Sequence, residues 1–301
     1  MAALELPVVE PAPAAAPSAL RKMDAVVVDC VRRTANTVSI YLFVGETGPY
    51  RAGQFISIDP HQFPELKHWV DYLEEQKGKA ELPRAYSLQS SPGEKCLSIC
   101  VEAEGYDPAL RRFPPLLSPF LASSSFKGRE LSVTGYSGAY VIPADLDQHT
   151  DEVLHVVSGA GVAPSYSILK DELKNAKHPR VRHTVLMVGK TLAELVLHEQ
   201  LNALAQAYPE RLQVVHALGD DEVGRGATPP RGALAAELMR KHLREPSTAR
   251  VYVSGASIPR TQRQRAKEQG VEPTPRFVET ALSRLEELGV PRAHVKREEF
   301  G

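Results

Sequence analysis

The feature that most constrains this 301-residue chain is a change of hydrophobic pattern near residue 148. From there on, apolar runs of strand length alternate with amphipathic stretches of helix length, beginning with "EVLHVVSGAG" and "SYSILKDELKNA". This alternation is typical of a parallel, doubly wound sheet, in which ligands bind at the carboxyl ends of the strands. We therefore predict an α/β domain over residues 148–301.

Residues 23–147 have a different pattern of short apolar or alternating runs separated by turn residues. Examples are "DAVVVDCV", "TVSIYLFV", "GQFISI", "CLSICVEAE" and "RELSVTGYSG". Such runs indicate antiparallel strands that close into a barrel or pack as a sandwich. We expect a β-barrel domain here, interrupted by an inserted helix over residues 64–79, where helix-favouring residues replace the strand pattern.

Composition excludes several classes of function. The 36 Lys and Arg balance 37 Asp and Glu, so the net charge gives no indication of a nucleic acid or an anionic membrane as partner, and any phosphate binding must be local. The three cysteines, Cys30, Cys96 and Cys100, form no CxxC pair or cluster, so we expect neither a metal site nor a disulfide. Residues 1–22 are rich in Ala and Pro and indicate a flexible tail, not a signal peptide or membrane span. A cytoplasmic protein is the expectation.

The turn "SGAGVAP" follows the first strand of the α/β half. Gly159 and Gly161 allow close approach of a phosphate, and the following helix offers unpaired N–H groups at the positive end of its dipole. Pro164 suits the first turn of that helix. The turn fits a dinucleotide, although close packing of a helix on a strand requires glycines as well.

The stretch "RAYS" in the barrel half carries three side chains that suit a flavin nucleotide. The Arg84 guanidinium can pair with phosphate oxygens, the Tyr86 ring offers a flat apolar face, and the Ser87 hydroxyl can bond a ring heteroatom. Taken alone, these residues are more typical of an ordinary strand edge than of a flavin site.

Six short segments occur in a fixed order along the chain: "YRAGQFISI", "RAYSLQSSP", "GYSGAY", "SGAGVAP", "VYVSG" and a terminal "EEF". This order resembles the ferredoxin-NADP reductase superfamily, which joins an antiparallel FAD-binding barrel to a nicotinamide-binding α/β domain. The resemblance covers roughly residues 23–301. It implies FAD and NADH or NADPH as cofactors, with Arg84 at the FAD pyrophosphate, Tyr86 against the isoalloxazine and Ser87 at its edge.

Further barrel residues match the family by position. The resemblance places Ile99, Cys100 and Val101 on a strand beside the flavin, and Ser118 near the pyrophosphate. Pro115 stands where the family has glycine, which is a departure at the pyrophosphate end.

In the α/β half, the resemblance implies that Gly159, Gly161 and Pro164 bind the nicotinamide coenzyme. Ala160 replaces the family's threonine between the two glycines. This half therefore lacks one hydroxyl near the nicotinamide.

Three residues are implied in the reaction itself. Ser254 stands where the family has a cysteine close to hydride transfer, and Gly255 follows it in the coenzyme site. Glu298 lies near the flavin, and Phe300 covers the flavin or the incoming nicotinamide. The serine makes slower or altered hydride transfer a hypothesis.

The choice of coenzyme rests on charged residues at the ends of the middle strands. Lys190, joined by Arg225 or Arg231, could bind the 2′-phosphate of NADPH. Asp220 or Asp221 could accept hydrogen bonds from a free ribose, which slightly favours NADH. Solvated surface charges are the alternative for all five.

The resemblance implies an FAD-dependent NAD(P)H oxidoreductase that passes single electrons to a separate ferredoxin or oxygenase component. One alternative is a reductase of free flavin, a ferric chelate or a quinone. Another is a flavin-binding relay or regulatory subunit with little coenzyme turnover.

Two insertions, 60–82 and 256–275, have no counterpart in the resemblance. We interpret the helical part of the first as a cover for the barrel, with a fold over the adenine end of FAD or a docking face as alternatives. The second reads as a solvated loop. Its basic side chains could instead dock an acidic electron acceptor; they are Arg260, Arg263, Arg265 and Lys267.

Overall fold

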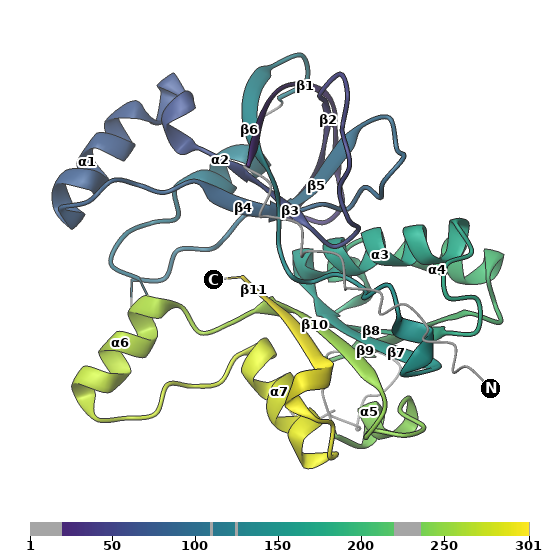
Figure 1. Ribbon diagram of the computed structural model, residues 1–301. Coiled ribbons are helices and arrows are strands. Elements are labelled where there is room, and N and C mark those ends of the chain that lie inside the picture. Colours follow the sequence, from purple (N-terminus) through teal and green to yellow (C-terminus); the bar gives the residue numbers. More distant parts are fainter. Residues whose placement is uncertain (1–19, 109–110, 124–125, 220–235, 301) are drawn as a thin grey trace, which may run out of the picture.

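The computed structural model describes residues 20–108, 111–123, 126–219 and 236–300. In this part of the chain, two sheets formed by separate halves of the sequence lie against each other (Figure 1). No helix among these residues is long and apolar enough to cross a bilayer.

The first sheet is an antiparallel, nearly closed barrel with the order β4-β3-β6-β1-β2-β5. Its outermost strands approach each other through a bridge between Leu88 and Ile99. The strands are β1 (Arg21–Arg32), β2 (Thr37–Phe43), β3 (Phe55–Ile58), β4 (Arg84–Ser87), β5 (Leu97–Glu102) and β6 (Glu130–Ser137).

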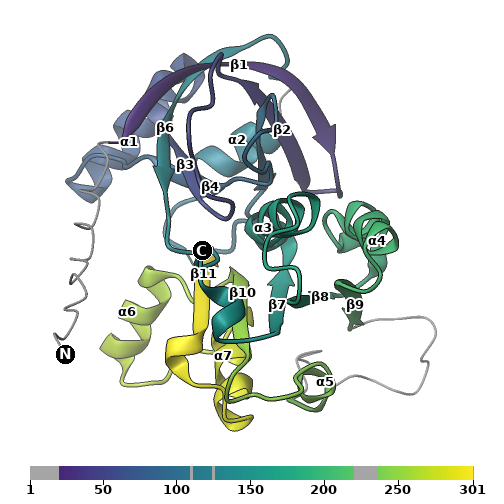
Figure 2. The same cartoon turned by 45° about the vertical axis from the view of Figure 1, so that its right-hand side comes forward.

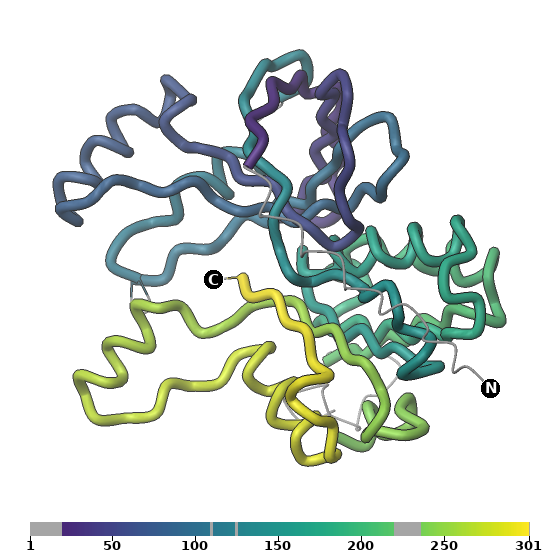
Figure 3. Tube along the Cα trace, in the orientation of Figure 1, coloured from purple at the N-terminus to yellow at the C-terminus, as the bar shows by residue number. Residues whose placement is uncertain are grey.

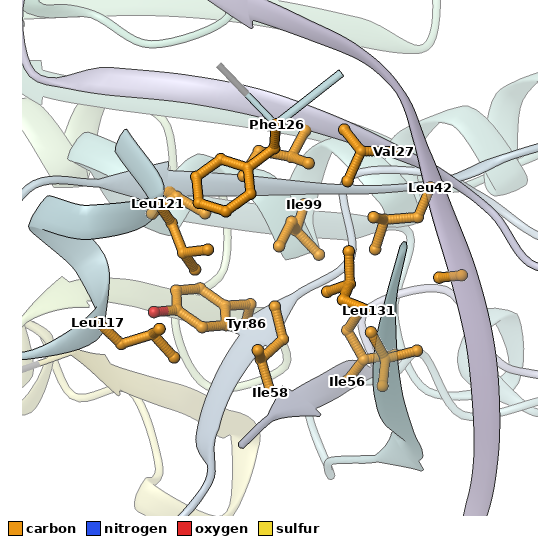
Figure 4. Close-up of a cluster of buried hydrophobic side chains, with 14 of the residues drawn as sticks. Val27, Leu42, Ile56, Ile58, Tyr86, Ile99, Leu117, Leu121, Phe126 and Leu131 are labelled. Atoms are coloured by element: carbon orange, nitrogen blue, oxygen red, sulfur yellow. The ribbon is translucent and has the colours of Figure 1, made fainter. Parts of the chain in front are cut away.

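The barrel has an apolar interior because alternate residues of each strand point inward. Leu97, Ile99 and Val101 of β5 are all fully buried there. Helix α2 (Leu117–Ser123) covers one opening, and its Leu117 and Leu121 join the core (Figure 4).

Helix α1 (Lys67–Lys77) confirms the helix predicted within the first insertion. Val70 and Leu73, three residues apart on one helix face, are buried against the barrel core. The helix ends at Gly78, whose left-handed conformation is the usual way to stop a helix.

The second sheet is parallel with the order β11-β10-β7-β8-β9. Helices α3 and α4 cover one face, and α5 and α7 cover the other (Figure 2). The strands are β7 (Glu152–Ser158), β8 (Arg182–Gly189), β9 (Leu212–Leu218), β10 (Arg250–Ala256) and β11 (Val295–Phe300). The helices are α3 (Val162–Lys174), α4 (His198–Ala207), α5 (Ala236–Lys241), α6 (Arg260–Gln269) and α7 (Phe277–Glu287).

Two elements differ from the expectation. The second insertion contains helix α6 where a solvated loop was expected, and only Ala266 of that helix is buried. The C-terminal residues form an unpredicted strand, β11, which pairs in parallel with β10 and carries the chain end toward the barrel (Figure 3).

The two halves meet in an apolar cluster of their own, around Ala52, Tyr140, Ile168 and Tyr252. Gly53 lies at this junction with a φ of +92°, and a Cβ there would lie 1.9 Å from the Tyr140 carbonyl oxygen. The position therefore requires glycine for two reasons, its backbone conformation and its lack of a side chain.

Substituting Gly53 by Ala should destabilise the fold more than the same change at Gly78. Both have positive φ, but a Cβ at Gly78 meets nothing within 4 Å. We expect Gly78→Ala to cost about 1 kcal/mol of unfolding free energy. Gly53→Ala should cost about 1–3 kcal/mol more, because a backbone oxygen must move. Urea unfolding followed by circular dichroism measures both, and equal costs would contradict the packing argument.

Candidate functional site

The residues that carry chemistry gather where the parallel sheet meets the barrel. Strands β7, β10 and β11 are parallel, so their carboxyl ends lie at the same edge. The C-terminus projects from this edge toward β3 and β4 (Figure 1). Parallel sheets bind their ligands at this edge, so the interface between the halves is the candidate site.

A hydrogen bond between Ser87 and Glu298 joins the two halves at this interface. The Ser87 hydroxyl, at the end of β4, donates to Oε1 of Glu298 on β11. Burial raises the pKa of Glu298 to about 7, although the bond from Ser87 lowers it in part. The carboxyl group can therefore change its protonation state near neutral pH.

Ser254 is the register partner of Glu298 in the β10–β11 pair. Its side chain is fully buried, and its Oγ has no hydrogen-bond partner among the described residues. Buried hydroxyls are rarely left unpaired, so this donor is available to a group that binds beside it. The next residue, Gly255, is tightly packed, because a Cβ there would lie 2.5 Å from the Phe277 ring.

The glycine turn after β7 fits closely against β10. Gly159 has a φ of +56°, and a Cβ on Gly161 would lie 2.3 Å from the Ser254 carbonyl oxygen. Pro164 lies in the first turn of α3, where its missing N–H leaves no bond unmade. The glycines thus bring the start of α3 next to the backbone of Ser254.

Glu102, at the end of β5, contacts this turn from the barrel side. Its Oε2 accepts a hydrogen bond of 2.9 Å from the Ala160 backbone N–H. The sequence-based predictions do not include this residue. The sequence did offer one sign of it: Glu102 directly follows Ile99–Val101, which were expected on a strand beside the flavin.

Arg84 and Tyr86 have well-defined surroundings. The guanidinium of Arg84 donates to Glu81 and to the Leu82 carbonyl, both at 2.5 Å. Burial alone would raise the pKa of Glu81, but hydrogen bonds from Lys77 and Arg84 lower it. The Tyr86 ring lies in the barrel core beside Leu117 (Figure 4).

The three adjacent residues predicted on β5 face two different ways. Ile99 and Val101 belong to the barrel core. Cys100 points to the other side and packs with Val157 and Ala160 of the α/β half. Burial raises the pKa of the Cys100 thiol to about 12, so it remains protonated and apolar.

The remaining predicted residues are spread over several elements. Ser118 lies on α2, where its hydroxyl accepts from the Glu104 N–H at 3.4 Å. Lys190 is exposed directly after β8, and Phe300 is half-buried at the end of β11. Arg225 lies outside the described residues, as do Arg231, Asp220 and Asp221.

The contacts therefore link one group of predicted residues at the interface: Ser87, Cys100, Gly159, Gly161, Ser254 and Glu298. Ser118 and Lys190 make their contacts elsewhere. The linked group offers a carboxyl that titrates near pH 7, a spare buried hydroxyl and a close-approach glycine turn. This set fits the reacting ends of a flavin and a nicotinamide.

Residues 156–261 match the family model described as "Oxidoreductase NAD-binding domain". The chain is 29% identical over 195 residues to the ferredoxin reductase component of 3-ketosteroid-9-alpha-monooxygenase of Mycolicibacterium smegmatis, covering 64% of this chain and 48% of that protein. It is 26% identical over 126 residues to NADH-cytochrome b5 reductase 2 of Coccidioides immitis, and this match covers 42% of this chain and 37% of that protein. The match thus spans less than half the length of each relative.

A solved structure of similar fold is that of ferredoxin-NADP+ reductase from Plasmodium falciparum. The TM-score is 0.62 at 15% identity, over 93% of this chain and 96% of that one. The predicted fold class, an antiparallel barrel followed by a parallel α/β domain, is confirmed by this likeness and by the two sheets.

The Glu298 carboxyl should make stability depend on pH. Its pKa is about 7 in the folded chain and near the ordinary 4.5 when unfolded, so the folded state binds more protons between these values. The unfolding free energy of wild type, relative to Glu298→Gln, should fall as pH rises from about 4.5 to about 7, then level off. The expected fall is on the order of 1–2 kcal/mol after allowing for partial exposure.

Urea unfolding at a series of pH values measures this difference. Ser87→Ala serves as a comparison, because removing its hydrogen bond should raise the pKa of Glu298 further. Parallel stability curves for wild type and Glu298→Gln would contradict the assignment.

Proposed function

We propose that this chain, a member of the ferredoxin-NADP reductase superfamily, is an FAD-dependent NAD(P)H oxidoreductase. The observation that carries the proposal is the bond from Ser87 of the barrel to Glu298, whose register partner is the buried, unpaired Ser254. One group from each half is thus in direct contact, and the spare donor lies on the neighbouring strand. When bound, the two cofactors would supply the hydride and single-electron chemistry.

The two halves have separate roles in this proposal. Residues 23–147 form the FAD-binding domain and residues 148–301 the NAD(P)-binding domain, after a tail of 22 residues. Arg84 would face the FAD pyrophosphate, with Ser118 as a further hydroxyl at that end. The glycine turn, Pro164 and Gly255 would hold the coenzyme, with Lys190 at its adenosine end.

The residues at the interface would act on the position and protonation of the bound rings. Ser87 orients the Glu298 carboxyl, which can hold or release a proton near pH 7 at the flavin edge. Ser254 donates a hydrogen bond from a dry environment, and Phe300 shields the rings from water. Tyr86, Ile99 and Val101 support the barrel wall behind the flavin, while Cys100 fills the gap between the halves.

For the electron acceptor we propose a separate ferredoxin or oxygenase component, in a cytoplasmic system. Support comes from the similarity to the ferredoxin reductase component of an oxygenase. The similarity to an NADH-cytochrome b5 reductase makes a cytochrome the competing acceptor. A ferredoxin and a cytochrome are both one-electron carriers.

Purified protein supplied with FAD should be yellow, and anaerobic NADH or NADPH should bleach its flavin band. The physical reason is that the interface residues would hold the two rings next to each other. Stopped-flow absorbance with each coenzyme gives the rates and decides between NADH and NADPH. Adding oxidised ferredoxin to the bleached protein should restore the band. A protein that binds no FAD would overturn the proposal, and restoration by free flavin or quinone alone would favour the alternative acceptors.

Replacing Ser254 by Cys should accelerate flavin reduction, because a polarizable thiol would replace a hydroxyl that has no partner. We expect an increase of about tenfold, which corresponds to roughly 1.4 kcal/mol of barrier. Single-turnover reduction by NADH measures the rate, and Ser257→Cys, at a buried position just beyond β10, is the matched control. An unchanged rate in Ser254→Cys would contradict the hypothesis that the serine slows hydride transfer.

A further inference from the structure

The glycine turn is contacted by an anionic group of the same chain. Glu102 Oε2 accepts from the Ala160 N–H at 2.9 Å, and a Cβ on Gly159 would lie 2.3 Å from that oxygen. We propose that Glu102 is an internal competitor for the phosphate of the coenzyme, which must displace this carboxylate to bind. The inference rests on the proposed nicotinamide-coenzyme site.

The competition follows from the number of donors. The Ala160 N–H carries one proton, so it cannot give a full hydrogen bond to a carboxylate and a phosphate together. The turn also opens α3, a helix of 13 residues whose positive end attracts either anion. Gly159 has no side chain, which is what allows the Glu102 oxygen to reach the turn.

Glu102 accepts a hydrogen bond from only one of the two donors near the turn. Gly161 of the same turn packs on the backbone of Ser254, whose hydroxyl is buried and unpaired among the described residues. Glu102 takes its bond from Ala160 and makes none to this hydroxyl. The spare donor indicates a further group beside the turn.

Displacement of Glu102 would also change the contact between the domains. Glu102 belongs to β5 of the barrel, whereas Ala160 belongs to the α/β half, so their hydrogen bond ties the two together. The other Glu102 oxygen already accepts from the Asn36 side chain at 3.3 Å, within the barrel. A displaced carboxylate therefore keeps a partner on its own side, and the Ser87–Glu298 bond remains as a separate link.

The test is the affinity of FAD-loaded protein for NAD⁺, measured by isothermal titration calorimetry at constant ionic strength. Glu102→Ala should lower the Kd about tenfold, because a charged hydrogen bond no longer has to be broken. Glu102→Gln should give a smaller decrease, since its amide oxygen can still accept. Glu75→Gln is the control: it removes one negative charge at an exposed position on α1 and should leave the Kd unchanged.

Hydrogen exchange gives a readout that does not depend on turnover. The Ala160 amide should exchange faster in Glu102→Ala than in wild type, and NAD⁺ should restore its protection. If the alanine variant does not fold, Glu102→Gln answers the same question.

An equal or higher Kd in the folded variants would overturn the inference and leave the proposed function standing. Absence of NAD⁺, NADH and NADPH binding in wild type and variants alike would overturn both.

Discussion

The parallel pairing of β11 with β10 is the constraint on which the candidate site depends. This pairing sets Ser254 opposite Glu298 and extends the sheet edge toward the barrel. Without it, a carboxyl near the C-terminus would have no fixed relation to Ser87, which is 211 residues away in the sequence. The glycine turn adds a second constraint, because the Gly161 backbone rests directly on β10. Together with the Ser87–Glu298 bond, these two contacts bring four distant segments of the chain to one place.

The sequence predicts the elements whose burial follows a simple rule. Strands β7, β8 and β10 each contain a buried stretch made mostly of apolar residues, as expected for strands covered on both faces. Strand β11 has four charged residues in six and no fully buried position, so hydrophobicity gives no sign of it. Helix α6 is just as polar, and it is stabilised at its end by the left-handed Gly270. Both elements form at the edge of the fold, where pairing and capping replace burial.

The candidate site was predictable as a set of residue types but not as a set of contacts. The motifs identify Ser87, the glycines, Ser254 and Glu298, because each matches a local pattern. They give no information on Glu102, since its partner Ala160 is 58 residues away and becomes a neighbour only when the halves pack. For β5, strand alternation could have separated Cys100 from Ile99 and Val101, because adjacent residues on a strand face opposite sides.

The ion pair between Glu81 and Arg84 links the first insertion to the rest of the molecule. Glu81 is almost fully buried, and it is bonded to Lys77 at the end of α1 as well as to Arg84 on β4. A buried carboxylate is stable only while its cations are present. Loss of residues 60–82 would remove the acid that pairs with Arg84, and replacement of Arg84 would leave the buried Glu81 with Lys77 but without its second cation. The insertion and β4 therefore depend on each other electrostatically, whatever the insertion does on the surface.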